Sequence, residues 1–269
     1  MKKVCILLAL GCLSLQMSFA QCGSKNTAFK SGETLQYDLF FNWKFVWVSV
    51  GSATWNVTQT QYGGKQAYRT TLTTTTSKKA DKYFIMRDKL TSYVDLNLTP
   101  LYYQKDANEG GTFRQEKVWY SYPSGQCALK MYYRRNQNAP SQKTYQSKTC
   151  AFDMLSMLLR ARSFDASTFK KGQHIPFLMA EGKRAQMRYF VYLGKKNFKM
   201  EGSNTTYRCL VFSYKEKEGG KDKEIVRFYV TDDANHLPVR LDLNLKFGTA
   251  KAYLRSVKGE RNPQTSIVK

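Results

Sequence analysis

The sequence is poor in histidine and has no recognisable catalytic or cofactor motif. Its 269 residues include two histidines, His174 and His236, and neither lies in a spacing that zinc sites use. There is no G-x-S-x-G nucleophile elbow and no S-x-x-K motif followed by its partner motifs. The Gly-Gly pairs lack the context of a phosphate-binding loop. We therefore predict no metal, no cofactor and no catalytic residue.

Long apolar runs are missing after the first twenty residues. Met1–Ala20 has two lysines, a short apolar run and a small-x-small end, which is typical of a cleaved secretory signal peptide. No later stretch approaches about 18 apolar residues, so residues 21–269 are predicted to be exported without a transmembrane span. Cys22 suggests a lipoprotein anchor as an alternative, but Gln21 stands where a lipobox needs a small residue.

Acidic residues are scarce relative to basic ones. The chain has 43 Lys and Arg against 20 Asp and Glu, a formal net charge of +23. Such a field favours anionic partners, and export points to lipid headgroups, lipopolysaccharide phosphates or acidic glycans rather than nucleic acid. The alternative is that Lys and Arg only solubilise strand faces. The chain has no run of five consecutive basic residues, which argues against a dedicated basic arm.

Alternation of apolar and polar residues with a period of two dominates the rest of the chain. In Val239–Phe247 every odd position is apolar and every even position is polar, as in a strand with one face in the core. Thr34–Phe41 has the same pattern. We predict an all-β, mostly antiparallel fold of curved sheets, barrel-like or sandwich. Further strands are expected at Ser52–Thr60, Gln66–Thr76, Lys89–Leu96, Leu101–Lys105, Gln115–Tyr122, Gln126–Arg134, Gln142–Cys150, Arg184–Leu193, Thr206–Tyr214, Ile225–Thr231 and Lys251–Val257.

One segment has helical periodicity instead. In residues 151–162 the apolar positions are 151, 154, 155, 158 and 159, the stripe of an amphipathic helix. Asp153 suits the N-terminal end as a cap. We expect this helix to pack on the sheet and close an open end of it, with a ligand-gating role as the alternative.

The helix divides the chain into two halves that resemble each other. Residues 28–149 and 164–258 each open on a Lys and Gly turn, at Gly32 and Gly172. Each half also has an Asp- and Asn-rich turn followed by Leu and Pro. An internal duplication explains this spacing, and chance similarity between β-meanders is the alternative. We predict a single all-β domain, 21–269, built from these pseudo-repeat halves.

Four cysteines remain after removal of the signal peptide, and an oxidising compartment favours disulfides. A hairpin centred between Asn138 and Ala139 would place Cys127 opposite Cys150, within bridging range. We predict that bridge. Cys22–Cys209 is then the remaining pair.

Three large aromatic residues, Trp43, Phe45 and Trp47, follow one another at every second position. On a single strand they would share one face. Such a face fits the core or an apolar groove that binds lipid chains or sugar rings. These three residues are the candidate ligand-binding residues.

Several short motifs together resemble one family. They are Gly32–Tyr37, Val50–Ala53, Asp153–Leu158, Val230–Asp233, Leu237–Val239 and Phe247–Thr249. They are similar to the hallmarks of exported Gram-negative proteins grouped as the domain of unknown function DUF3108, in a form typical of Bacteroidales. The resemblance covers nearly the whole mature chain. It implies periplasmic or envelope residence and an all-β build, and it implies no activity, substrate or catalytic residue.

These observations favour a non-enzymatic binding or envelope-associated protein, periplasmic or outer-envelope, for an amphipathic or anionic component such as a lipid or glycan. A structural module that pairs with another envelope protein through a strand edge is the alternative. A glycan-processing enzyme is the third hypothesis, because paired carboxylates assemble only in space. Glu33, Asp38, Asp88 and Glu181 are interpreted as exposed strand or turn charges.

Overall fold

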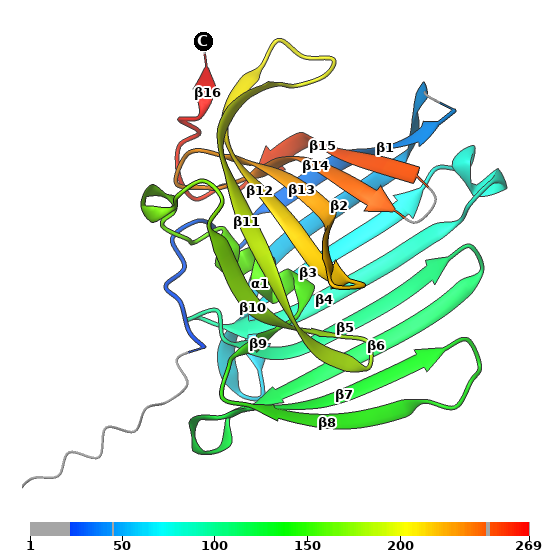
Figure 1. Cartoon of the computed structure of the whole chain (residues 1–269), viewed down its shortest axis with the longest axis vertical. Helices are drawn as coiled ribbons and strands as arrows, with labels where there is room; N and C mark the ends of the chain where they lie inside the picture. Colours follow the sequence, from blue (N-terminus) through cyan, green and yellow to red (C-terminus); the bar gives the residue numbers. More distant parts are fainter. Residues whose placement is uncertain (1–21, 45, 246–247, 269) are drawn as a thin grey trace, which may run out of the picture.

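The computed structural model describes residues 22–44, 46–245 and 248–268, so the predicted signal peptide 1–20 lies outside the described residues. Strands make up most of this chain, around one α-helix in the described ranges (Figure 1). The elements are β1 Thr34–Trp43, β2 Val46–Tyr62, β3 Lys65–Thr76, β4 Met86–Asp95, β5 Pro100–Glu109, β6 Thr112–Ser121, β7 Cys127–Arg135, β8 Ser141–Ser147, β9 Ala151–Phe152, α1 Met154–Ala161, β10 His174–Glu181, β11 Arg184–Lys199, β12 Thr206–Glu218, β13 Lys221–Thr231, β14 Pro238–Leu245, β15 Gly248–Lys258 and β16 Ile267–Val268, with 3-10 helices at Ala80–Lys82, Pro123–Gly125 and Ala166–Thr168.

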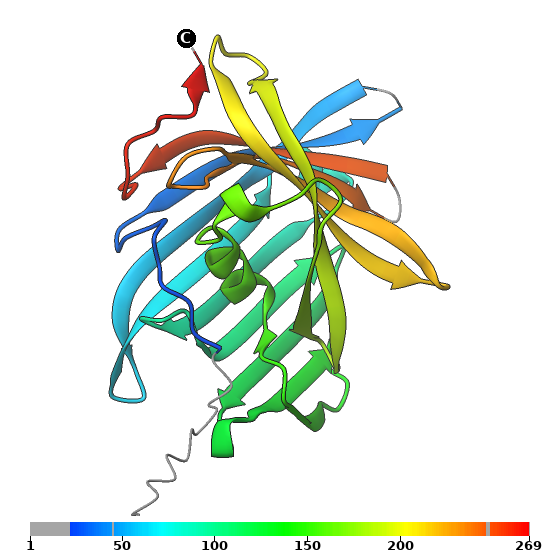
Figure 2. The ribbon, with the colours of Figure 1, turned by 60° about the vertical axis from the view of Figure 1, so that its left-hand side comes forward.

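A single sheet contains all the strands, which confirms the all-β prediction and selects the barrel-like form over the sandwich. β1–β8 form one antiparallel meander and β10–β15 form another, and the two meanders join where β1 pairs with β15. β8 and β9 are the two ends of the strand order, and only β9 with β10 is parallel. The sheet curves until it nearly closes around α1 (Figure 2).

Paired glycines make three of the hairpin turns. The turns at Gly63-Gly64, Gly110-Gly111 and Gly219-Gly220 each have two successive positive φ angles, between 57° and 80°. This conformation matches the twist of the flanking strands and excludes residues with a Cβ unless they are strained. The glycine pairs therefore set the register of the hairpins β2–β3, β5–β6 and β12–β13.

The helix α1 is shorter than predicted because the chain before it is a strand. Ala151–Phe152 pair with β10 as β9, and the helix begins after Asp153. The Asp153 carboxylate accepts hydrogen bonds from the backbone N–H groups of Leu155 and Ser156, and the Ser156 hydroxyl accepts one from the Asp153 N–H, which completes a capping box. Asp153 also accepts from Ser92 Oγ at 3.0 Å, so the cap fixes the helix to β4. The cap predicted at Asp153 is confirmed. Within the described ranges no helix is long and apolar enough to cross a membrane.

The predicted disulfides are wrong. Cys22 pairs with Cys150, while Cys127 and Cys209 are buried and lie outside any disulfide. The hairpin β7–β8 turns at Arg135–Asn138, where the Asn138 N–H donates to the Arg135 carbonyl at 3.1 Å. This turn is closer to the N-terminus than predicted, so Cys127 faces Ser147 and Cys150 lies beyond the strand. The bridge instead ties the N-terminal segment to the chain just before β9.

Candidate functional site

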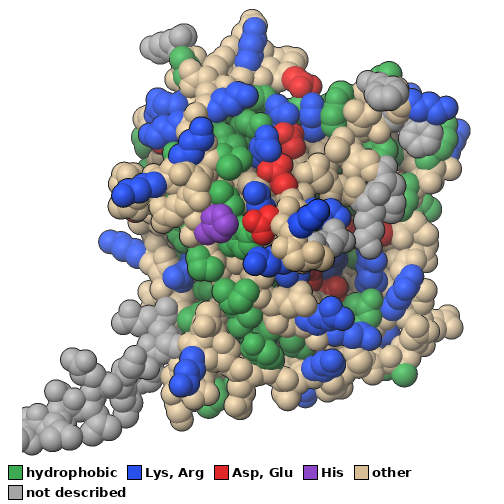
Figure 3. Space-filling model, in the orientation of Figure 1, with side chains coloured by type: hydrophobic (Ala, Val, Ile, Leu, Met, Phe, Trp, Pro, Cys, Tyr) green, Lys and Arg blue, Asp and Glu red, His purple; other side chains and the backbone are tan. Residues whose placement is uncertain are grey.

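The inner face of the sheet, which we define as the side that contacts α1, has an apolar half. Cross-strand partners share a face, and Phe212 lies opposite Phe228, which lies opposite Leu241. The side chains of this face are half-buried rather than buried. We call this surface the apolar wall, and its residues are Phe212, Tyr214, Val226, Phe228, Val230, Leu241 and Leu243. Figure 3 shows patches of apolar side chains on one face of the molecule, with Lys and Arg side chains and a few acidic ones among them.

An aromatic pocket lies where the apolar wall meets the end of α1. It encloses about 40 Å³ of water-sized free space, and about 520 Å³ when its open mouth is included. The enclosed part has room for a few atoms, and the mouth continues it toward solvent. The lining is almost wholly apolar: Leu158, Ala161, Arg162, Phe164, Ala166, Phe190, Leu210, Phe212, Phe228, Val230, His236 and Pro238. A site of this kind suits a hydrocarbon chain better than a polar ligand.

The loop after α1 covers one side of the pocket with aromatic rings. The ring of Phe169 lies 6.0 Å from Phe164, 5.9 Å from Tyr192 and 6.1 Å from Phe212, between ring centroids. The 3-10 helix in this loop is capped by Asp165, which accepts from the Ser167 N–H at 3.0 Å. The Ser167 hydrogen bonds hold the pKa of Asp165 below its usual value. The loop is therefore an ordered cover that contacts the wall through its rings.

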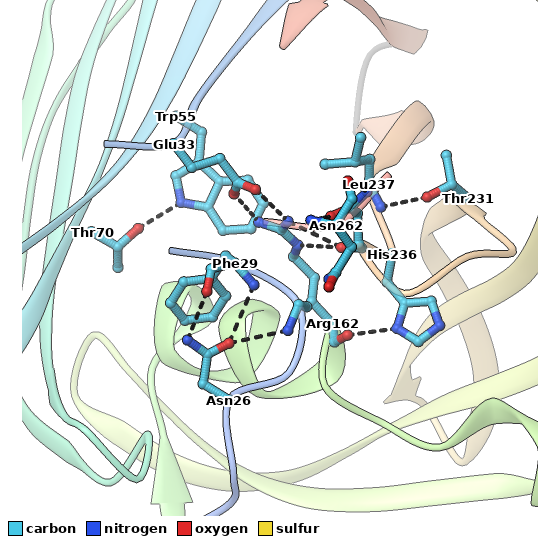
Figure 4. A network of polar contacts seen from close by, with 12 residues as sticks. Asn26, Phe29, Glu33, Trp55, Thr70, Arg162, Thr231, His236, Leu237 and Asn262 are labelled. Atoms are coloured by element: carbon cyan, nitrogen blue, oxygen red, sulfur yellow. Dashed lines mark hydrogen bonds and ion pairs between the residues drawn. The ribbon is translucent and has the colours of Figure 1, made fainter. Parts of the chain in front are cut away.

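A buried ion pair anchors the C-terminal end of α1 beside the pocket (Figure 4). Arg162 is 3% exposed and Glu33 is 1% exposed, and the guanidinium donates to both carboxylate oxygens, at 2.9 Å for Nη2 to Oε1. Its Nε and Nη2 also donate to the Asn235 carbonyl, at 3.1 and 3.0 Å. The guanidinium lies 5.6 Å from the ring of Phe29 and 5.5 Å from that of Trp55. Each of the three guanidinium nitrogens donates to Glu33 or Asn235, so Arg162 serves the structure rather than an anionic ligand.

The same anchor joins segments that are far apart in the sequence. The Arg162 carbonyl contacts His236 Nδ1, and Asn235 Nδ2 donates to the Asn262 carbonyl at 2.7 Å. The N-terminal segment, the helix end, the β13–β14 turn and the C-terminal segment therefore meet at one point. The interpretation of Glu33 as an exposed charge is wrong, because α1 delivers an arginine to it across 129 residues.

The inner face of β4–β6 has polar and charged side chains where the apolar wall has rings. We call these residues the polar wall: Asp88, Lys105, Glu109, Arg114 and Glu116. Burial of Asp88, with the negative charge of Glu109 second, raises the pKa of the Asp88 carboxyl from 3.8 to about 7. The Glu109 carboxylate therefore lies close enough to Asp88 for the two negative charges to repel each other.

The polar wall also holds the tip of the β10–β11 hairpin. The Gly182 N–H donates to Glu116 Oε2 at 2.8 Å, which connects the two meanders across the open side of the sheet. Among the described residues, no group of three or more His, Cys, Asp or Glu is arranged to hold a metal ion.

The predicted aromatic triplet does not lie on one strand. Trp43 ends β1 and Trp47 belongs to β2, whereas Phe45 is outside the described residues. Lys44 has φ of 45°, a turn conformation that breaks the expected strand. Trp47 lies beneath the ammonium of Lys251, at 3.9 Å from Nζ to the ring centroid. A ligand role for the three residues stays a prediction, and Trp47, the one whose side chain the structure describes, does not line the aromatic pocket.

The pocket residues were missed for two reasons. The alternation in β12 and β13 identified the strands but could not show that one inner face remains half-exposed. The sequence pattern places Arg162 at the end of the helix, but no local pattern connects it to Glu33, because the two residues lie far apart in the chain. The available signal was the pair of rings Phe212 and Tyr214, two positions apart in β12, together with Phe228 in β13.

Comparison with known proteins identifies a family and a fold. The profile of the family "Protein of unknown function (DUF3108)" matches residues 36–255. A β-barrel-like protein of domain of unknown function DUF1849 from Brucella abortus has a similar fold, with a TM-score of 0.58, 11% identity, and coverage of 86% of this chain and 98% of that chain. A protein assigned as exported, with a YmcC-like fold, from Bacteroides fragilis matches at a TM-score of 0.37 and 7% identity, over 87% of this chain and 99% of that chain. The comparison with curated proteins finds no match.

Proposed function

Because this chain belongs to the DUF3108 family, whose description assigns no activity, we propose from its own geometry that it binds an amphipathic molecule of the cell envelope. The observation that supports the proposal is the apolar wall that leads into the aromatic pocket. An acyl chain would lie along the wall, with its end against Phe190 and Phe228 beside α1. The protein would bind this molecule without changing it.

The interior suits a ligand that is apolar on one side and polar on the other. The apolar wall offers half-buried rings, while the opposite polar wall is charged and its Arg114 is already paired with Glu109. A hydrocarbon chain gains about 0.8 kcal/mol for each methylene that leaves water. The net charge of +23 favours an anionic headgroup over a cationic one.

The proposed location is the periplasm or the outer envelope. The sequence begins with the features of a secretory signal, and the Cys22–Cys150 disulfide is consistent with an oxidising compartment. Both observations fit a binding protein that works among envelope lipids or glycans.

Native mass spectrometry of protein purified from its own envelope tests the proposal, followed by denaturation to identify any co-purified molecule. Binding of a fluorescent long-chain fatty acid provides a second readout. We expect Phe228→Ser to weaken probe binding at least tenfold, because the ring forms both wall and pocket. Met187→Ser, at an exposed site on β11, two strands away from β13 in the sheet, is the matched control. Absence of a bound molecule, together with equal probe binding by both variants, contradicts the proposal.

An edge strand supports the alternative function, pairing with another envelope protein. β8 ends the strand order, and most of its side chains are exposed. Such an edge can accept a strand from a partner. Thr144→Pro removes a backbone donor from this edge strand, so it would abolish a partner complex while leaving fatty acid binding intact.

A further inference from the structure

Three connections at one end of the sheet expose large apolar side chains. They are the β1–β2 hairpin with Val46 and Val48, the β3–β4 loop with residues 83–85, and the β14–β15 hairpin with Leu245. Their strands are neighbours in register, since Gly51 pairs with Thr76 and Phe41 pairs with Ala250. Figure 1 shows the three connections at the same end. Half of the exposed large apolar side chains of the described chain belong to them.

The β3–β4 loop presents the most exposed of these side chains on an ordered base. Tyr83 is 82% exposed, and Phe84 and Ile85 follow it. The Phe84 N–H donates to the Ala80 carbonyl at 3.0 Å, and the Ile85 carbonyl accepts from the Gly110 N–H at 2.8 Å. Hydrogen bonds therefore fix the loop to itself and to the β5–β6 turn. We call Tyr83-Phe84-Ile85 the apolar prong.

The side chains around the prong are mostly basic. Lys78, Lys79 and Lys82 are exposed in the same loop, and Lys44 is exposed in the β1–β2 turn. The one acidic residue of the loop, Asp81, is paired with Arg87 at 2.5 Å. The lysines thus leave a positive charge next to exposed rings. Aromatic side chains with flanking lysines are the combination that anchors proteins at the boundary of an anionic bilayer.

We propose that this end of the molecule docks on an anionic phospholipid bilayer. The prong inserts among the headgroups and acyl chains, Val46 and Leu245 contact the same surface, and the lysines bind lipid phosphates. Charge complementarity favours a bilayer over a second copy of this chain, because two such basic ends would repel each other. Docking would place the hollow of the sheet against the lipid, where a lipid could enter it. The inference therefore deepens the proposed function, and only the reason for docking, not the docking itself, rests on that function.

Co-sedimentation with vesicles tests the inference. The wild-type protein should bind vesicles of phosphatidylcholine with phosphatidylglycerol, bind vesicles of phosphatidylcholine alone much less, and release on addition of salt. The variant Tyr83→Ser/Phe84→Ser/Ile85→Ser should bind the anionic vesicles at least tenfold more weakly. Lys78→Gln/Lys79→Gln/Lys82→Gln should weaken binding to the anionic vesicles by a similar factor. The binding that this variant retains should depend less on salt.

Matched controls come from the opposite end of the molecule. Leu96→Ser/Ile267→Ser/Val268→Ser removes exposed apolar side chains there, and Lys170→Gln/Lys171→Gln/Lys199→Gln removes exposed charges. Both should bind like the wild type. Failure of the wild type to bind anionic vesicles overturns the inference, as does equal binding by the prong variant and its control. A dimer in light scattering that the prong variant abolishes would assign this surface to a second copy instead.

The two proposals can fail separately. Phe228→Ser changes the apolar wall and should still sediment with anionic vesicles. The prong variant should still bind the fluorescent fatty acid in solution. Loss of both activities in both variants, with melting curves unchanged, would overturn the assignment of docking to one end.

Discussion

The apolar wall and the polar wall are built by the same alternation, yet they differ in what they offer a ligand. In β12–β14 the inner positions are rings and aliphatic chains, and in β4–β6 they include acids and bases. The polar side chains form bonds within the structure, such as Glu116 with Gly182. The rings of the apolar wall remain half-exposed. The surface that remains free for a ligand in the hollow is therefore the apolar wall rather than the polar wall.

The largest expected effect concerns the anchor that holds α1 between the two walls. Arg162→Met leaves the Glu33 carboxylate buried without its partner, so the free energy of unfolding should fall by about 3–5 kcal/mol. Chemical denaturation measures the loss. Arg255→Met is the control, because Arg255 and Asp38 form an exposed pair at 3.5 Å that should contribute less than about 1 kcal/mol. The double variant Glu33→Leu/Arg162→Met should recover much of the loss, and no recovery would mean that the charge is not the cause.

Removal of the disulfide should have the next largest effect. Cys22→Ser/Cys150→Ser frees a loop with a sequence separation of 128, and the free energy of unfolding should fall by about 3 kcal/mol. Thermal melting with and without reductant checks this result. Cys127→Ser/Cys209→Ser is the matched control: it keeps the Cys22–Cys150 bridge, so reductant should still lower its melting temperature, whereas the melting temperature of Cys22→Ser/Cys150→Ser should not depend on reductant. A wild-type melting temperature that reductant leaves unchanged would contradict the Cys22–Cys150 pairing.

A direct comparison of the walls should give a smaller change in stability. Leu241→Ser/Leu243→Ser removes two half-buried side chains from the apolar wall, with an expected cost of about 2 kcal/mol and a large loss of fatty acid binding. Thr74→Ser, on the inner face opposite Asp88, should change both quantities little. Denaturant titration and probe binding at the same temperature separate the two effects. Equal binding by both variants would show that the apolar wall contributes no more to binding than a side chain next to the polar wall.

The smallest expected effect is the pH dependence of the polar wall. The pKa of Asp88 is raised from 3.8 to about 7, so the folded protein retains a proton that the unfolded chain releases. Its contribution to stability is complete below about pH 4 and is lost as the pH rises through about 7. After solvent screening we expect about 1 kcal/mol. Asp88→Asn should flatten the stability profile between these values, whereas Asp38→Asn should not, and a steeper profile in Asp88→Asn would contradict the assignment.

Alternation predicted most of the strands but not the β10 strand. His174–Glu181 has little clear alternation because its C-terminal part, residues 177–180, is buried on both faces. The helix was predicted at the right place, since its apolar stripe is local. The turn of β7–β8 was predicted a few residues too late, which was enough to give the wrong disulfide. In the same way, one turn at Lys44 separated Trp43 from Trp47.

The sequence by itself determined the properties that depend on neighbours along the chain. These are the period-two strands, the glycine turns with positive φ, the cap at Asp153 and the positive charge. The tertiary structure alone decided which residues meet across long separations: Glu33 with Arg162, Cys22 with Cys150, and the rings of β12 and β13 with the end of α1. The physical reason is that alternation assigns a side chain to a face. Only the curvature of the nearly closed sheet decides whether that face is filled by another element or left as a surface for a ligand.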